Sequence, residues 1–132
     1  MEERQKQRVA VYCRSGHEKS DDHLQFQVGS ILYLIQRNPD WELKEVYGDF
    51  GIDGCSSGAQ LSLHRLMKDC KNGDVDIVLF KALSRLTRDV PKACRYIRDL
   101  HKMGVRVVLE REGIDTGRPS DLKLLSVIEQ IF

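Results

Sequence analysis

The arrangement of apolar residues constrains the fold of this chain more than any other feature of its sequence. Three nearly continuous apolar runs read VAVYC at residues 9–13, DIVLF at 76–80 and VRVVLE at 105–110. Runs of this kind are typical of parallel strands that helices cover on both faces. A fourth run with strand character, ELKEVYG, lies at residues 42–48. Segments of helical periodicity lie between these runs, and strands that alternate with helices predict βαβ units.

We therefore predict one α/β domain of three layers, in which a mostly parallel sheet of four to five strands carries helices on both faces. A length of 132 residues fits a single domain of this kind. Three helices are predicted from apolar residues that recur three and four positions apart. Their stripes are Leu24, Val28, Ile31 and Ile35, then Leu63, Leu66, Met67 and Cys70, then Val90, Cys94, Ile97 and His101.

A further amphipathic helix is predicted to begin near Asp121, after the turn-like segment DTGRPS at 115–120. No stop signal follows before Phe132, so we expect the chain to be a piece cut inside a longer helix, the alternative being a helix that ends blunt and apolar. An apolar stripe on a helix outside a small sheet also predicts a partner helix, so we expect dimerisation. The stripe consists of Leu122, Leu125, Ile128, Ile131 and Phe132.

The cysteines and the hydropathy of the chain argue against several classes of protein. Cys13, Cys55, Cys70 and Cys94 form no C-x-x-C or C-x-x-H pair, which argues against a zinc site and against a secreted disulfide framework. No apolar stretch approaches the ~20 residues of a membrane span, and the opening MEERQKQR lacks the apolar core of a signal peptide. We therefore expect a cytoplasmic protein.

Positive charge is concentrated in one part of a nearly neutral chain. The net charge is +1, yet the segment 81–106 holds eight Lys and Arg against two Asp. A basic stripe on a neutral protein predicts a local anionic partner, and the competing interpretation is a solvated helix face. The basic residues are Lys81, Arg85, Arg88, Lys92, Arg95, Arg98, Lys102 and Arg106.

Candidate functional residues follow three of the predicted strands. In an open α/β sheet, the reactive crevice lies beyond the carboxyl ends of the strands. Arg14 and Ser15 follow the first strand, the small-residue loop GDFGIDGCSSG occupies 48–58, and Lys81 precedes SRLTR at 84–88. If the last segment is helical, its two arginines, three positions apart, project from one face.

Three arginines, at positions 14, 85 and 88, could thus converge beside the hydroxyl of Ser15. The planar guanidinium fork suits phosphate oxygens and stays charged at any working pH. A serine ringed by arginines is a device for attacking a phosphodiester, because the arginines neutralise charge that develops on the phosphate oxygens.

Less specific interpretations of the same residues stay open. Ser15 and Gly16 are also ordinary turn residues at the end of a strand, and the two arginines of SRLTR are also ordinary surface charges. Cys13 is better interpreted as a buried structural cysteine than as a nucleophile, since a low-mass tyrosine phosphatase would need an arginine at Lys19. The segment CRSGHEK has one glycine, so it lacks the G-x-G-x-x-G of a dinucleotide fold. An unrelated α/β phosphate-binding enzyme remains an alternative.

Five blocks occur together in one order and are more specific than any single motif. They are VAVYCR followed by a serine, a helix that contains Gln27, NPDWEL with VYGDFGIDG, DIVLFKALSRLTRD, and GVRVVLEREGIDT. In this combination the chain resembles the amino-terminal catalytic domain of the serine site-specific recombinases (resolvases and invertases), and above all that of the large serine recombinases. The resemblance covers residues 8–132.

The resemblance implies a site-specific DNA recombinase whose serine forms a link to the 5′ phosphate, followed by strand exchange and religation, without a metal or other cofactor. The fold it implies is that of a resolvase catalytic domain over residues 1–120, with the start of a long oligomerisation helix at 121–132. The implied partners are double-stranded DNA, a second copy of the chain and, for the full-length protein on DNA, a synaptic tetramer, with no membrane and no small-molecule substrate. The implied setting is the cytoplasm of a bacterium, with a phage or mobile element as the other possible source of the gene. The implied site residues are Ser15, Arg14, Arg85 and Arg88 as catalytic residues, supported by Gln27 and Ser84.

Two departures from the family pattern bear on activity. The family spells its first motif arginine, any residue, serine, whereas Ser15 follows Arg14 directly and Gly16 takes the expected serine position. The following loop is about two residues shorter than usual, so a shift of register could place Ser15 correctly. Gln60 stands where the family has an arginine, and Arg65 is a possible substitute a turn and a half further on. The alternative hypothesis is a degenerate, catalytically impaired domain that assembles and binds DNA.

Overall fold

The computed structural model describes residues 5–15, 21–50 and 60–131, and for residues 15, 21–28 and 50 it describes the backbone alone. The elements in chain order are β1 (Gln7–Ser15), α1 (Asp21–Gln36), β2 (Trp41–Phe50), α2 (Leu61–Lys71), β3 (Ile77–Phe80), the 3₁₀ helix η2 (Leu83–Arg85), α3 (Val90–Lys102), β4 (Arg106–Leu109), β5 (Ile114–Asp115) and α4 (Pro119–Ile131).

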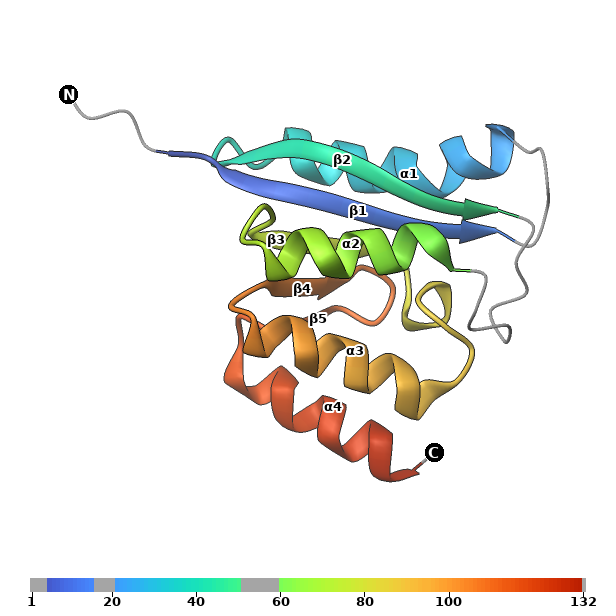
Figure 1. Cartoon of the computed structure of the whole chain (residues 1–132), viewed down its shortest axis with the longest axis vertical. Helices are drawn as coiled ribbons and strands as arrows, with labels where there is room; N and C mark the ends of the chain where they lie inside the picture. Colours follow the sequence, from blue (N-terminus) through green and yellow to red (C-terminus); the bar gives the residue numbers. More distant parts are fainter. Residues whose placement is uncertain (1–4, 16–20, 51–59, 132) are drawn as a thin grey trace.

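The strands form one five-stranded sheet in the order β2-β1-β3-β4-β5 (Figure 1). The pairs β1–β2, β1–β3 and β3–β4 are parallel, and only β5 runs antiparallel, against β4. The prediction of a mostly parallel sheet of four to five strands is therefore confirmed. The two-residue strand β5 lies partly in the segment 115–120, which the sequence indicates as a turn. The sequence does not predict this strand, because it has no apolar run and forms only through its pairing with β4.

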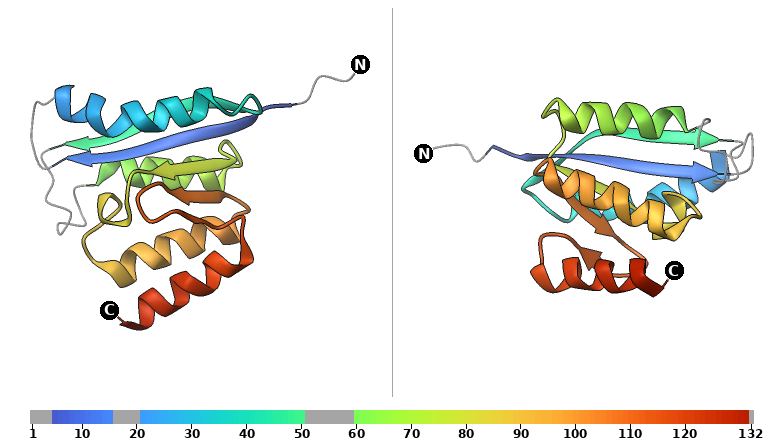
Figure 2. Two further views of the ribbon diagram at one scale, coloured as in Figure 1. Left: turned by 180° about the vertical axis from the view of Figure 1, so that it is seen from behind. Right: turned by 60° about the horizontal axis from the view of Figure 1, so that its bottom comes forward.

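Helices cover both faces of the sheet, as the apolar runs predict (Figure 2). Side chains alternate along β1, so Val9 and Val11 pack in the cluster that contains Ile31 and Ile35 of α1. Their neighbour Tyr12 faces the other way, into the larger cluster under α2 and α3. The larger cluster also contains Leu63, Leu66, Phe80, Cys94, Ile97 and Leu100.

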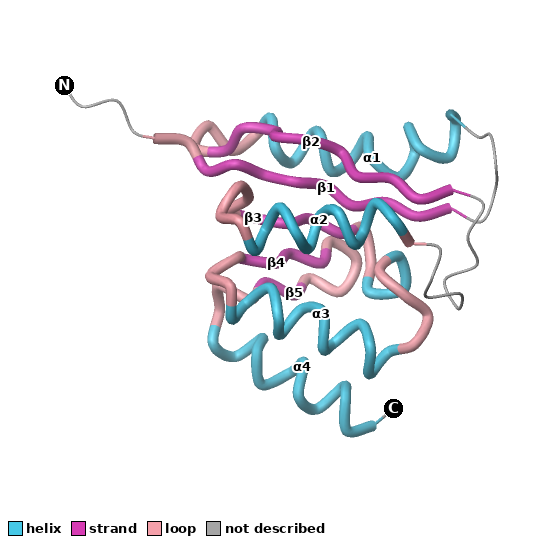
Figure 3. The backbone as a smooth tube through the Cα atoms, in the orientation of Figure 1, coloured by secondary structure: helices cyan, strands magenta, loops and turns pink. Residues whose placement is uncertain are grey.

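The last helix, α4, packs against α3 and adds to the larger apolar cluster (Figure 3). Leu125 is its buried residue, and Glu129 forms an ion pair with Arg98 of α3. The opposite side of α4 exposes a row of large apolar side chains, Leu124, Val127 and Ile131. Among the described residues, no helix is long and apolar enough to cross a membrane.

Three of the four cysteines are buried core residues. Cys13, Cys70 and Cys94 are free thiols, each at most 3% exposed. Burial, with a smaller contribution from Asp49, raises the pKa of the Cys13 thiol to about 11. Burial likewise raises the pKa of Cys70 to about 12 and also raises the pKa of Cys94. Because the thiolate is the reactive form, the interpretation of Cys13 as a structural residue is confirmed.

These raised pKa values predict that the three buried thiols are inert in the folded protein. In a Cys55→Ser variant, we expect no reaction with a thiol-specific disulfide reagent at about pH 8, and full reaction after unfolding in urea. The measurement is absorbance of the released reporter over time. Rapid reaction of any thiol in the native protein would contradict this prediction.

Candidate active site at the carboxyl edge of the sheet

The parallel strands β1, β2 and β3 end at one edge of the sheet (Figure 1), and Arg14 lies near the end of β1. In the register of the parallel pair β1–β2, Arg14 is opposite Asp49 and Ser15 is opposite Phe50. The segment after β3, residues 82–88, contains both arginines of SRLTR and is called the arginine loop below. Parallel strands bring such ends together whatever the distance between them in the sequence.

Arg14 joins the end of β1 to the arginine loop. Its side chain is only 3% exposed, and its Nη2 donates a hydrogen bond of 2.5 Å to the backbone carbonyl of Ser84. A buried guanidinium needs hydrogen-bond acceptors to offset the loss of water. Arg14 therefore contacts the loop after β3, and the contact uses the backbone of Ser84, not its hydroxyl.

The arginine loop itself is not a continuous helix. A single 3₁₀ turn forms through hydrogen bonds from Arg85 N to Ala82 O, 3.0 Å, and from Leu86 N to Leu83 O, 3.1 Å. The chain then leaves helical geometry and re-enters it only at α3, where the Asp89 carboxylate caps the helix by accepting from Lys92 N at 3.1 Å. The condition for two arginines on one helical face is therefore not met.

Arg85 is half-buried and Arg88 is exposed, each from a different local structure. Within residues 5–15, 21–50 and 60–131, neither guanidinium has a hydrogen bond or an ion pair to another side chain. Both arginines come from the loop that Arg14 contacts.

Gln60, at whose position the resemblance leads one to expect an arginine, is buried, 1% exposed. Its Nε2 donates to the backbone carbonyl of Leu86 at 2.8 Å and to the hydroxyl of Tyr12 at 3.2 Å. It occupies the N-cap position of α2 but makes no side-chain cap bond there. The amide therefore connects the arginine loop to β1.

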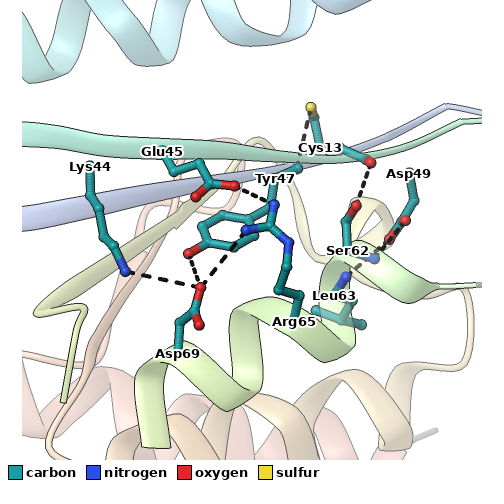
Figure 4. A network of polar contacts seen from close by, with 10 residues as sticks. Cys13, Lys44, Glu45, Tyr47, Asp49, Ser62, Leu63, Arg65 and Asp69 are labelled. Atoms are coloured by element: carbon teal, nitrogen blue, oxygen red, sulfur yellow. Dashed lines mark hydrogen bonds and ion pairs between the residues drawn. The ribbon is translucent and has the colours of Figure 1, made fainter. Parts of the chain in front are cut away.

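Asp49 connects this pair to the start of α2. Its carboxylate, 6% exposed, accepts from the hydroxyl of Tyr12 at 2.7 Å. It also accepts from the backbone N–H groups of Ser62 at 2.9 Å and Leu63 at 3.1 Å (Figure 4). A carboxylate at a helix N-terminus satisfies orphan N–H donors and interacts favourably with the helix dipole. Burial of Tyr12, together with its bond to Asp49, raises its pKa, so the phenol stays a proton donor.

Glu112, in the turn after β4, contacts the backbone of the arginine loop, which the sequence does not predict. The backbone N–H of Leu83 lies 3.2 Å from each of its carboxylate oxygens. The residue lies in the REG segment between β4 and β5, and nothing in that pattern indicates a role. Arg14, Gln60 and Glu112 thus hold the backbone of the arginine loop from three separate elements.

Arg65 does not replace the missing arginine at position 60. Its guanidinium lies 4.4 Å from the centre of the Tyr47 ring and forms ion pairs with Glu45 and Asp69 (Figure 4). The Tyr47 hydroxyl in turn donates to Asp69 at 2.6 Å. These contacts hold Arg65 beside Glu45 and Tyr47, in the middle of β2. The suggestion that Arg65 takes the role of an arginine at position 60 is therefore wrong.

Part of the basic segment 81–106 is neutralised inside the protein. Lys81 pairs with Glu110, Arg98 with Glu129 and Arg106 with Asp115. Lys92 and Arg95 of α3 have no such partner among the residues that the structure describes. Both lie in α3, the helix that follows the arginine loop in the sequence.

Several predicted site residues lie where the structure gives no side chain. The backbone of Ser15 ends β1 and that of Gln27 lies in α1, but their side chains are outside the described part of the chain. Gly16 and the loop 51–58 also lie outside it. The roles of Ser15 and Gln27 therefore stay predictions.

The contacts of Asp49 predict a large effect on stability. We expect Asp49→Ala to lower the free energy of unfolding by about 3 kcal/mol, because two buried donors and one part-buried donor lose a charged acceptor. The exposed Asp74→Ala is the control and should change it by less than about 0.5 kcal/mol. Urea unfolding followed by circular dichroism measures both, and equal values for the two variants would overturn the assignment.

Comparisons with known proteins agree with this geometry. The family model described as "Resolvase, N terminal domain" matches residues 9–131. The fold is similar to that of the N-terminal catalytic domain of TP901-1 integrase, with a TM-score of 0.84, 23% identity, and coverage of 94% of this chain and 93% of that one. It is also similar to a resolvase family site-specific recombinase from Streptococcus pneumoniae, with a TM-score of 0.76, 24% identity, and coverage of 96% and 87%.

No curated protein sequence matches the chain significantly. The two structures, both under 25% identical, establish the fold, whereas the family model spans nearly the whole chain and establishes descent. A mostly parallel five-stranded sheet with helices on both faces is the architecture that the sequence resemblance implies. The chain belongs to the resolvase family of serine recombinases, as a catalytic domain.

Proposed function

We propose that this domain cuts and rejoins DNA strands, with Ser15 as the nucleophile and Arg14, Arg85 and Arg88 as the groups that bind the reacting phosphate. Membership of the resolvase family supports a recombinase. The observation that carries the proposal is the hydrogen bond from Arg14 to the Ser84 carbonyl, because it brings the arginine loop to the end of β1, where Ser15 follows.

In the proposed reaction, the Ser15 oxygen attacks a backbone phosphorus and the bond from phosphorus to the 3′ oxygen breaks. The serine loses its proton, the departing 3′ oxygen gains one, and a 5′-phosphoseryl link remains. Attack by a 3′ hydroxyl of the exchanged strand reverses the step, frees the serine and reseals the DNA. One phosphoester replaces another in each step, so no oxidant, reductant or hydrolysis is needed. Gln27 and Ser84 are proposed to support the site.

The arginines of the loop fit a phosphodiester because their guanidinium groups are not committed to carboxylates within the described structure. A cation that waits without a protein partner can neutralise charge on the phosphate as it develops in the transition state. The cations of α3, Lys92 and Arg95, extend the positive surface and would contact the DNA backbone without reading sequence. Binding by the domain should accordingly weaken as salt rises.

One observation favours a second candidate, a degenerate domain that assembles on DNA but cuts poorly. The amide of Gln60 is buried and donates hydrogen bonds to Leu86 O and to the Tyr12 hydroxyl. Because an amide is neutral, it supplies no cation to the phosphate. Loss of one such donor costs on the order of 10²–10³ in rate, by analogy with an oxyanion-hole donor. The two candidates predict different outcomes in a cleavage assay.

The assay offers the full-length protein a DNA site whose crossover carries a nick, so that the cut fragment is lost and the covalent link is trapped. We expect a protein–DNA adduct on denaturing gels that Ser15→Ala abolishes, and that Arg88→Ala reduces by about 10²-fold or more. Lys71→Ala, an exposed cation at the far end of α2, is the matched control and should behave as the wild type. Absence of any adduct under conditions that support synapsis would favour the degenerate domain.

We also propose that the exposed apolar row of α4 mediates association with a second copy of the chain. Leu124, Val127 and Ile131 are 45%, 50% and 70% exposed and lie three and four residues apart, on one side of the helix. Apolar surface gathered in this way gains about 25 cal/mol per Å² when a partner covers it. Formation of a tetramer on DNA is part of the same proposal.

Changing this row should weaken the association without unfolding the domain. We expect the double variant Val127→Glu and Ile131→Glu to raise the dimer dissociation constant at least about tenfold, since two apolar contacts are lost. The control adds the same charge at exposed polar positions, through Gln36→Glu and Gln130→Glu. Sedimentation equilibrium measures both, and a wild-type chain that stays monomeric at high concentration would refute the role of α4.

A further inference from the structure

The arginine loop has little structure of its own. Its backbone makes two internal hydrogen bonds, Arg85 N to Ala82 O and Leu86 N to Leu83 O, which close one 3₁₀ turn. A 3₁₀ turn has poorer hydrogen-bond geometry than an α-helix and is marginal alone. The two guanidinium groups that it carries, on Arg85 and Arg88, make no described contact that could fix the loop. Its conformation must therefore be set by groups outside it.

Three side chains supply those groups, and each reaches a different backbone atom. The carboxylate of Glu112 accepts from Leu83 N, Arg14 donates to Ser84 O, and Gln60 donates to Leu86 O. The residues come from the turn after β4, from β1, and from the position before α2, and they are separated by 26 to 70 residues from their loop partners. This set of three side chains is called the clamp.

Gln60 is the part of the clamp with the most constrained surroundings. A buried amide that lacks partners costs about 1–3 kcal/mol, so its two N–H donors must both be used. One goes to Leu86 O and the other to the Tyr12 hydroxyl, which itself donates to Asp49. The direction of every bond in this chain is fixed, because Asp49 can only accept and Leu86 O can only accept. The amide therefore fits as a double donor and no hydrogen-bond acceptor could replace it.

The chemistry of Gln60 also keeps its neighbours free. An amide supplies the two donors without adding positive charge beside Arg14, which is itself buried. It fixes the loop through the backbone, so the side chains of Arg85 and Arg88 need no protein carboxylate to hold them in place. A loop that is rigid in its backbone and uncommitted in its cations is preorganised to receive an anion.

We propose that Gln60 and Glu112 are positioning residues, which hold the backbone of the arginine loop so that Arg85 and Arg88 are presented together to a DNA phosphate. That Gln60 and Glu112 hold the loop concerns the loop alone, whereas the presentation of the arginines to DNA rests on the proposed function. Neither residue touches the phosphate. Gln60 thus has a different task from the cation that the family pattern leads one to expect at this position.

The first test is the variant Gln60→Glu, which replaces the double donor by a group whose donor capacity depends on pH. At about pH 7.5 the carboxylate cannot donate to Leu86 O, so protection of the Arg85 and Leu86 amides from hydrogen exchange should fall at least about tenfold. Protonation of the buried carboxyl restores a donor, so protection should return as the pH falls toward about 5. The control Gln36→Glu makes the same change at an exposed position of α1 and should leave both amides as in the wild type.

The second test uses Glu112 and keeps the proposal falsifiable if Gln60→Glu does not fold. Glu112→Ala should lower the protection of the Leu83 amide at least about tenfold, whereas Glu112→Gln keeps an acceptor oxygen and should retain most of it. Amides of β3, such as Leu79, report global stability and should keep their protection in both variants. The proposal would be overturned if Glu112→Ala left the exchange protection of the loop amides unchanged. It would also be overturned if Gln60→Glu lowered the protection of the loop and of β3 equally and independently of pH.

A functional readout separates this proposal from the proposed reaction. In the nicked-DNA assay, the adduct yield of Gln60→Glu relative to wild type should rise as the pH falls, in parallel with loop protection. Loop protection that returns while the relative yield does not would show that the clamp does not serve the chemistry, and would overturn its role toward DNA. If the wild type forms no adduct, the proposed reaction fails while the exchange measurements still decide whether Gln60 and Glu112 hold the loop.

Discussion

The carboxyl edge of the sheet depends on a short chain of buried hydrogen bonds that begins at Asp49. Its carboxylate accepts from Tyr12 and from the first N–H groups of α2, and Tyr12 in turn accepts from Gln60, which reaches the arginine loop. Asp49, Tyr12 and Gln60 are buried, where an unmade hydrogen bond costs more than a made one contributes. These bonds connect α2, β1 and the arginine loop.

These bonds join the ends of strands to the segments that follow them. Parallel strands place their ends side by side, but they do not fix the segments that follow. Here the segment after β3 is held by side chains of Arg14, Gln60 and Glu112 that bond to its backbone atoms. The cations of α3 also differ in their surroundings. Arg98 forms an ion pair with Glu129 of α4, while Lys92 and Arg95 stay on the surface. Charge on this protein is thus divided between structural and exposed cations by the tertiary contacts.

Much of the fold could be predicted because burial leaves a local signature. Ile77–Phe80 is buried on both faces and is continuous in its apolar residues, and Leu63, Leu66 and Cys70 recur at helical spacing for the same reason. The five motif blocks identified the family, and Arg14 was expected beside the loop after β3. The short strand β5, the single 3₁₀ turn of the arginine loop and the role of Glu112 could not be predicted, because each is fixed by residues far away in the sequence.

Position 60 separates the two kinds of information most clearly. The sequence by itself determined the α/β fold and the family, since these follow from apolar periodicity and from motifs that are contiguous in the chain. It also showed that an amide stands where a cation was expected. Only the tertiary structure decided what that amide does, and it turned Arg65 away to Glu45 and Tyr47. The physical reason is that a hydrogen bond is directional and short, so its partners are known only when distant segments have been brought together.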